Sequence, residues 1–333
     1  MRRLLGVVLV ASLLWAGWWA FGAWGARTAF AGWFEARRSA GWVADYADLS
    51  VAGFPNRFDI TLTQPRLADP ATGWAWEAPF FQVLALSYQP NHVIAVWPPD
   101  HALAAPDAKL RILSAKMQAS LVLRAGPSLE LDRMTMVADT LTLRAESGEE
   151  VSMTAFRSAV DRQDEGPARY RFGISTQDLS LPPGLRRLVG AADSLPQRFS
   201  ALSVDLVAAF DKPWDRSAVE QARPQPVLID LSLAQAKWGD LDIAMAGKVT
   251  VDAEGRPEGR ITIKAQNWQQ MLAMAETSGA LAPRVADQAE GVLGMLARAS
   301  GNPNSLDLPL DFARGLVFVG PIPVGPAPVI RLR

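Results

Sequence analysis

The sequence predicts a mainly β protein, in which an N-terminal transmembrane helix is followed by a large curved antiparallel sheet with a few covering helices. Three observations support this fold class. Residues 4–26 contain no charged side chain. Beyond residue 50, apolar side chains recur at every second position, which is typical of half-buried antiparallel strands. Helical periodicity is confined to a few short stretches. With 333 residues, of which 49% are hydrophobic, the chain has enough apolar material for a packed core.

The uncharged stretch "LLGVVLVASLLWAGWWAFGAWGA" is long enough to cross a bilayer. At about 1.5 Å per residue, its length exceeds the roughly 30 Å of a hydrocarbon core. A cleaved signal peptide is the alternative, with Ala23 and Gly25 as its cleavage site, but such apolar regions usually run only about 7 to 15 residues. Tryptophan rings prefer the membrane interface, which favours a retained anchor. The anchor residues are Leu4, Leu14, Trp15, Trp18, Trp19 and Trp24.

Charge placement predicts the orientation of this anchor. Arg2 and Arg3 favour a cytoplasmic leading end, so the bulk of the chain is expected in the periplasm of a bacterium. The protein is then a single-pass inner-membrane protein, or a soluble periplasmic one if the segment is cleaved. Residues 27–40 have helical propensity and extend the helix until Gly41 ends it. We therefore expect an anchor with a helical extension over 1–40 and a mainly β periplasmic domain over 41–333.

The stretch "GFPNRFDITLTQPRL", from Gly53 to Leu67, illustrates the strand pattern and its ambiguity. Its apolar residues alternate with polar ones, so one side of the strand is apolar and the other is hydrated. The same alternation suits a closed protein core and a groove for acyl chains. About fifteen candidate strands share this pattern. The candidate lipid-facing residues are Phe58, Ile60, Leu62, Leu121, Leu123, Leu141, Leu143, Ile229, Leu231, Ile243 and Met245.

The best-defined hairpin and the helices follow from turn and capping signals. Residues 241–251 form a long strand that bends at Gly247, and "DAEGRPEG" supplies the turn before a return strand over 261–266. Short helices are predicted at 182–196 and 213–223. A clearer helix begins after Asn267, and a further one runs from Pro283 to Gly301.

Several function classes have no support in the sequence. The 33 Lys and Arg residues balance 34 Asp and Glu residues without a basic run, which argues against nucleic-acid binding. The chain has no cysteine. Its two histidines, His92 and His101, lack metal-ligand spacing and are expected at the surface or in turns. No serine-hydrolase elbow, phosphate loop or dinucleotide motif occurs. We expect a protein without a cofactor that is not an enzyme.

Three segments resemble a known bacterial family. Behind a leading anchor, "GFPNRFDITLTQPRL", "DIAMAGKVTVDAEGRPEGRITIKAQNW" and "LDLPLDFARGLVFVGPIPVGPAPVI" resemble the uncharacterised envelope proteins grouped as domain of unknown function 2125. That group is in turn similar to the AsmA-like envelope proteins. This second resemblance implies a long curved sheet with an apolar groove and a role in phospholipid movement between membranes.

Two interpretations of the apolar strand faces therefore stand side by side. Few helices are available to cover so many half-buried strands, so the remaining face pairs with another sheet, closes on itself or binds lipid. The first interpretation is a membrane-anchored periplasmic protein that binds or moves phospholipid, with the bilayer and phospholipid as its partners. The second is a non-enzymatic envelope scaffold or assembly factor with a filled core.

Overall fold

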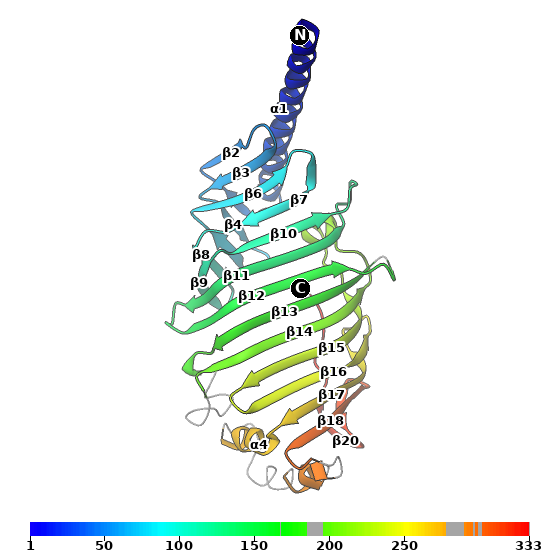
Figure 1. The fold of residues 1–333 in the computed structure, drawn as a ribbon. Coiled ribbons are helices and arrows are strands. Elements are labelled where there is room, and N and C mark those ends of the chain that lie inside the picture. Colours follow the sequence, from blue (N-terminus) through cyan, green and yellow to red (C-terminus); the bar gives the residue numbers. More distant parts are fainter. Residues whose placement is uncertain (167, 185–195, 278–289, 296, 299–301, 333) are drawn as a thin grey trace. The chain divides into compact units, whose positions relative to one another are not determined.

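The computed structural model describes residues 1–333 except 167, 185–195, 278–289, 296, 299–301 and 333 (Figure 1). Strands make up 54% of the chain, and they belong to one large antiparallel sheet that is not closed. A long apolar helix precedes the strands, and other helices are few. The predicted fold class is therefore confirmed.

The N-terminal helix α1 extends over Arg2–Ser39 and includes both the uncharged stretch and its predicted extension. Gly41 follows with a φ of 88°, a left-handed conformation that glycine adopts without strain. Among the described residues, α1 is the helix long and apolar enough to span a membrane. At about 1.5 Å per residue, its 38 residues are nearly twice as long as a hydrocarbon core is thick.

The chain divides into two compact units. Unit 1 comprises residues 1–125 and 136–148, and unit 2 comprises residues 126–135 and 149–333. Helix α1 therefore belongs to the same unit as the first ten strands. Strand β11 (Leu131–Ala145) contributes residues to both units.

Unit 1 contains two antiparallel ladders. The first runs in the order β2, β3, β6, β7, β10, and the second in the order β1, β4, β5, β8, β9, β11. Trp76 of β5 and Phe81 of β6 make an edge-to-face contact at 5.7 Å, so the two ladders meet through their apolar sides. The strands are β1 (Val43–Asp45), β2 (Asp48–Ala52), β3 (Arg57–Thr63), β4 (Arg66–Asp69), β5 (Trp74–Glu77), β6 (Phe80–Leu86), β7 (Gln89–Val96), β8 (Asp100–Ala105), β9 (Ala108–Ala115) and β10 (Gln118–Leu123).

The second half of α1 covers the apolar side of this unit. Phe34 is buried together with Ala44, Leu49, Ile60 and Leu62, which come from both ladders. Successive turns of α1 contact this cluster, because small or aromatic residues recur on the side of the helix that faces the strands. Those packed around the cluster from α1 are Ala26, Phe30, Ala31 and Trp33. The apolar side of β3 thus faces the protein's own helix.

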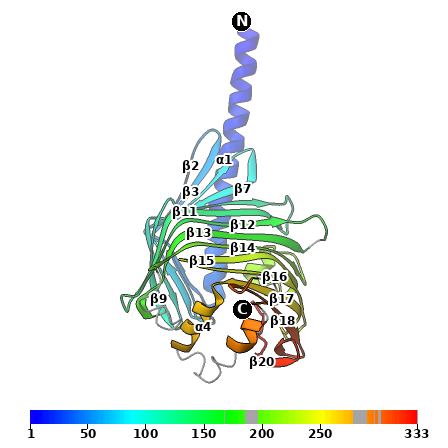
Figure 2. The ribbon, with the colours of Figure 1, turned by 60° about the horizontal axis from the view of Figure 1, so that its bottom comes forward.

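Unit 2 is a meander in which each strand pairs with the next one along the chain. Figure 2 shows β14 to β18 following one another around α4. The strands are β12 (Glu150–Arg162), β13 (Arg169–Ser180), β14 (Arg198–Phe210), β15 (Pro226–Trp238), β16 (Leu241–Val251), β17 (Pro257–Gln266), β18 (Ser305–Ala313), β19 (Leu316–Val319) and β20 (Ile322–Pro326).

The predicted hairpin is the pair β16–β17, and Gly247 lies at its bend. Its φ is 153°, and a Cβ at this position would lie 2.3 Å from the carbonyl oxygen of Arg260. A side chain would therefore force the two strands apart. Glycine is required here by the close approach of the neighbouring backbone.

The helices match the predictions where the structure describes them. The helix predicted at 213–223 is α3 (Arg216–Glu220), and the Asp215 carboxylate accepts from the Ser217 backbone N–H at 2.8 Å as its N-cap. The helix predicted after Asn267 is α4 (Trp268–Thr277). The helix predicted at 182–196 lies largely outside the described residues. Of the one predicted at 283–301, residues 290–295, 297 and 298 are described and are helical.

The packing of α1 on β3 gives a stability prediction with a matched control. A Cβ on Gly22 would lie within van der Waals distance of the buried Phe58 ring, whereas nothing lies within 4 Å of one on Gly17. Gly22→Leu should lower the free energy of unfolding of the detergent-solubilised protein by about 1–3 kcal/mol through overpacking. Gly17→Leu should not lower it. Thermal unfolding followed by circular dichroism measures both variants, and an equal response of the two would contradict the packing of α1 on β3.

Candidate functional site

The cross-strand registers place apolar residues of unit 2 on one side of the sheet. In one row, Val204 of β14 pairs with Ala234, Ala234 with Met245, Met245 with Ile263, and Ile263 with Leu308. In the next, Leu206 pairs with Leu231, Leu231 with Gly247, Gly247 with Ile261, and Ile261 with Leu310. We call this side the apolar face and define it by Val204, Leu206, Ile229, Leu231, Ile243, Met245, Ile261, Ile263, Leu308 and Leu310.

A β-bulge in β15 keeps this face continuous. The register shifts between Leu231 and Ala234, so two residues intervene where regular alternation has one. Leu233 pairs with Asp205 and lies on the opposite side, exposed to solvent. Without the bulge, every residue of β15 beyond Leu231 would change sides.

The centre of the apolar face is incompletely covered. All ten residues that define it are partly exposed, and none is buried. Ile174 of β13, which pairs with Val204, is 41% exposed. Fully packed sheet interiors bury such side chains, so the described residues leave part of this face open to solvent or to another molecule.

Both ends of the same face are closed by aromatic residues. At one end, Tyr170 is fully buried with Val160, Ala208 and Phe210, and Trp214 packs edge-to-face on Phe210 at 5.6 Å. Burial raises the pKa of the Tyr170 phenol, whose oxygen accepts a hydrogen bond from the Trp214 backbone N–H at 3.1 Å. The apolar face is therefore covered at this end by the aromatic cluster around Tyr170.

At the other end, Trp238 stacks on Phe199 at 4.3 Å and is buried with Leu241. Next to it, Trp268 of α4 is buried with Ala265, Ala297 and Leu306. The indole N–H groups of both tryptophans donate to proline carbonyls, Trp238 to Pro196 at 2.7 Å and Trp268 to Pro303 at 3.0 Å. The uncovered centre thus lies between two packed ends.

The opposite side of unit 2 is charged. Arg171 donates from Nε to Asp205 at 2.9 Å, and Arg260 donates to Asp311 at 2.6 Å. The hydrogen bonds from Arg171 hold the pKa of the Asp205 carboxyl below its usual range. Exposed pairs of this kind contribute little to stability, because solvent screens them. They identify this side as the hydrated one.

The eleven sequence-predicted lipid-facing residues are distributed over both units. Ile229, Leu231, Ile243 and Met245 lie together on the apolar face of unit 2 and are half-buried. In unit 1, Phe58, Ile60 and Leu62 are buried under α1, and Leu141 is also buried. The half-buried predicted residues of unit 1 are Leu121, Leu123 and Leu143.

The sequence pattern predicts the other strands of the apolar face, but their residues are not among the predicted lipid-facing ones. Val204, Leu206, Ile261 and Ile263 belong to alternating stretches, and Leu308 and Leu310 lie in "LDLPLDF". Alternation shows that a strand has an apolar side, but only the register shows which strands present it together. Those registers depend on the bulge in β15, which no sequence signal marked.

The predicted anchor residues all lie on α1. Leu4, Leu14, Trp15, Trp18 and Trp24 are exposed. Two of the indole N–H groups also donate to backbone carbonyls, Trp15 to Pro55 in the β2–β3 turn at 3.0 Å and Trp19 to Arg57 at the start of β3 at 2.7 Å.

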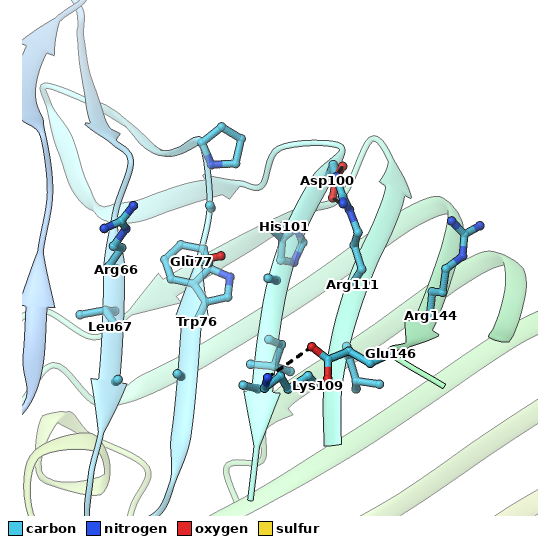
Figure 3. Close-up of a pocket in the computed structure, with 18 of the residues that line it drawn as sticks. Arg66, Leu67, Trp76, Glu77, Asp100, His101, Lys109, Arg111, Arg144 and Glu146 are labelled. Carbon is cyan, nitrogen blue, oxygen red and sulfur yellow. Dashed lines mark hydrogen bonds and ion pairs between the residues drawn. The ribbon is translucent and has the colours of Figure 1, made fainter. Parts of the chain in front are cut away.

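Unit 1 has a pocket of about 1060 Å³ on β4, β5, β8, β9 and β11, lined by both apolar and charged side chains (Figure 3). Arg111 donates from Nε to Asp100 at 2.7 Å, which holds the pKa of the Asp100 carboxyl below its usual range. Lys109 and Glu146 form a second pair at 3.3 Å. The charged lining comprises Arg66, Glu77, Asp100, Lys109, Arg111, Arg144 and Glu146. Because cations and anions are interleaved, the pocket has no strong preference for ligands of one charge.

The histidines differ from expectation in one respect. His92 is half-buried on β7, with Nε2 2.8 Å from Ser120 Oγ. His101, expected at the surface or in a turn, is buried in β8 beside Trp76, because alternation turns it toward the apolar side of its ladder. Burial lowers the pKa of the His101 imidazole. Among the described residues, no group of three or more His, Asp or Glu side chains is placed to hold a metal ion.

These features define a mainly β protein with a long apolar N-terminal helix and an incompletely covered sheet face. Comparison with protein families identifies it further: residues 19–328 match the family described as "Uncharacterized protein conserved in bacteria (DUF2125)", and the chain belongs to that family. This confirms the first resemblance seen in the sequence. No curated protein matches the chain, and no solved structure does.

The burial of His101 predicts a pH dependence of stability. The folded-state pKa of His101 lies below the ordinary value of about 6.5. Its contribution to the free energy of unfolding is therefore fully present above about pH 6.5 and is lost as the pH falls through the folded-state pKa. The midpoint of urea unfolding should therefore fall between pH 7 and pH 5 in the parent. His101→Phe, which keeps an apolar ring beside Trp76, should reduce that fall. The same fall in the variant would show that other groups are responsible.

Proposed function

We propose that this protein is a single-pass membrane-anchored envelope protein that binds phospholipid acyl chains on the apolar face of unit 2, with its folded part in the periplasm. The observation that carries the proposal is the row of half-buried aliphatic residues between two packed ends. The protein acts by binding rather than by catalysis. The similarity to AsmA-like proteins expected from the sequence would imply the same function.

The dimensions and energetics of the apolar face suit an acyl chain. The six strands from β13 to β18 lie about 4.8 Å apart, so the face extends about 24 Å across them. An acyl chain in one leaflet of a bilayer is about 15 Å long. Each methylene buried on the face contributes about 0.8 kcal/mol, so one chain has enough apolar surface for stable binding.

Two buried donors lie at the Tyr170 end, and a polar headgroup would reach them after a local rearrangement of side chains. Arg162 Nε and Trp214 Nε1 have no hydrogen-bond acceptor among the described residues. Arg162 is the cross-strand partner of Tyr170, and Trp214 donates its backbone N–H to the Tyr170 phenol. A phosphate or ester oxygen would satisfy such donors, which otherwise cost about 1–3 kcal/mol each.

The contacts of α1 support a retained anchor. Cleavage near Ala23 or Gly25 would remove Trp15 and Trp19, which donate to the β2–β3 turn, and would uncover Phe58. Signal sequences are discarded and do not need to fit the mature fold. Helix α1 instead continues from an exposed apolar segment into the core around Phe34.

The test compares three substitutions to aspartate in the full chain. Ile243→Asp, on the apolar face, should abolish co-purifying phospholipid while the protein stays folded, because a partly exposed carboxylate can hydrate. Ala246→Asp, three residues further along β16 and on the opposite side of the sheet, should keep the lipid. Ile60→Asp should destabilise unit 1 by several kcal/mol, since its carboxylate would be buried without a partner. Native mass spectrometry with lipid extraction and circular dichroism measure lipid and fold in the same samples.

Two outcomes would contradict lipid binding. A parent protein that carries no phospholipid would favour an envelope scaffold with a filled core. Unfolding of Ile243→Asp to the same extent as Ile60→Asp would likewise show that the apolar face is an ordinary core.

A further inference from the structure

Two hairpin tips of unit 1 lie beside α1 (Figure 2). The β2–β3 turn comprises residues 53–56, and the β6–β7 turn comprises Ser87 and Tyr88. The two turns are joined by a hydrogen bond from the Ser87 backbone N–H to the Asn56 carbonyl at 2.8 Å. The first turn is held against α1 by the indoles of Trp15 and Trp19.

The position of these contacts along α1 sets the depth of the tips. Trp15 and Trp19 lie 11 and 15 residues after Leu4, about 16 and 22 Å along the helix axis. A hydrocarbon core that begins near Leu4, next to the charges of Arg2 and Arg3, extends about 30 Å. Both contacts therefore fall within the thickness of the bilayer, on the side of the outer leaflet.

Most of the carbonyl groups around the β2–β3 turn are paired within the protein. The Gly53 carbonyl accepts from the Arg57 N–H at 2.9 Å, and the Asn56 carbonyl accepts from Ser87. The indole N–H groups of α1 satisfy the carbonyls of Pro55 and Arg57, and Pro55 has no N–H to satisfy. Unsatisfied backbone groups are excluded from lipid, so this degree of pairing suits a membrane-embedded turn.

The exposed aromatic side chains at the tips suit the outer leaflet of a bilayer. Phe54, which is 59% exposed, has an apolar ring suited to hydrocarbon, and Tyr88, which is 63% exposed, has an amphipathic ring of the kind that favours the membrane–water interface. Phe54 also packs edge-to-face on Trp19 at 5.4 Å. Arg57 is paired with Asp59, and its long side chain can extend to the headgroups.

We propose that the β2–β3 and β6–β7 tips insert into the outer leaflet beside α1, so that the membrane contact of unit 1 consists of a helix and two hairpin tips. The partner is the lipid bilayer itself. This inference rests on the membrane anchoring in the proposed function and adds a second contact to it. It does not depend on lipid binding by unit 2.

The absence of cysteine allows each position to be probed separately. Single-cysteine variants of the full chain, Leu9→Cys, Phe54→Cys and Trp74→Cys, are labelled with a thiol-reactive fluorophore and reconstituted into phosphatidylcholine–phosphatidylglycerol vesicles. Trp74, in the β4–β5 region of the same unit, is 50% exposed and is the matched control. Quenching by acyl-brominated phosphatidylcholine should be at least threefold stronger at positions 9 and 54 than at position 74. Tyr88→Cys should behave like Phe54→Cys, and circular dichroism verifies the fold of each variant.

The outcomes separate the tip insertion from the anchor. Strong quenching at position 9 with equal, weak quenching at 54 and 74 would overturn the insertion and leave the anchor intact. Weak quenching at position 9 would overturn the anchor. In a Phe54→Cys background, Trp15→Phe with Trp19→Phe keeps aromatic rings but removes both indole donors, and quenching at position 54 should fall about twofold. Unchanged quenching would show that these donors do not hold the tip in lipid.

Discussion

The two-residue alternation of side chains, kept in phase from strand to strand by the antiparallel registers, determines most of the architecture of unit 2. Because Val204, Met245, Ile263 and Leu308 lie in one transverse row, their apolar surfaces join into a single face. The charges between them are directed to the other side. An apolar face of this width needs a cover, and the described residues supply it only at the two ends.

The bulge in β15 shows how closely the continuity of the apolar face depends on this phase. If Leu231 and Ala234 were separated by one residue instead of two, the rest of β15 would present Leu233 to the apolar face and Ala234 to solvent. The bulge and the glycine bend at Gly247 lie on neighbouring strands, and Leu231 pairs with Gly247. Both irregularities therefore occur within the half-buried part of the face.

Periodicity and capping in the sequence predict the fold class, the N-terminal helix, the β16–β17 hairpin and helices α3 and α4. The environment of each strand does not. Phe58, Ile60 and Leu62 have the same alternation as Ile229 and Leu231, yet the first three lie under α1 and the other two are half-buried. The difference arises because the side chains around Phe34, in the second half of α1, pack on strands of unit 1. The stretch after residue 26 shows helical propensity, but which strands the helix contacts is a tertiary property that no local pattern records.

The central claim is that phospholipid acyl chains contact the apolar face of unit 2, and photo-crosslinking tests it most directly. The full-length protein is reconstituted with phosphatidylcholine that carries a diazirine in its acyl chain, irradiated and digested, and the modified peptides are mapped by mass spectrometry. Lipid binding on the apolar face predicts adducts on residues of β15, β16 and β17 such as Leu231, Met245 and Ile263, together with adducts on α1 from the bilayer. Adducts confined to α1 and the hairpin tips beside it would contradict lipid binding by unit 2.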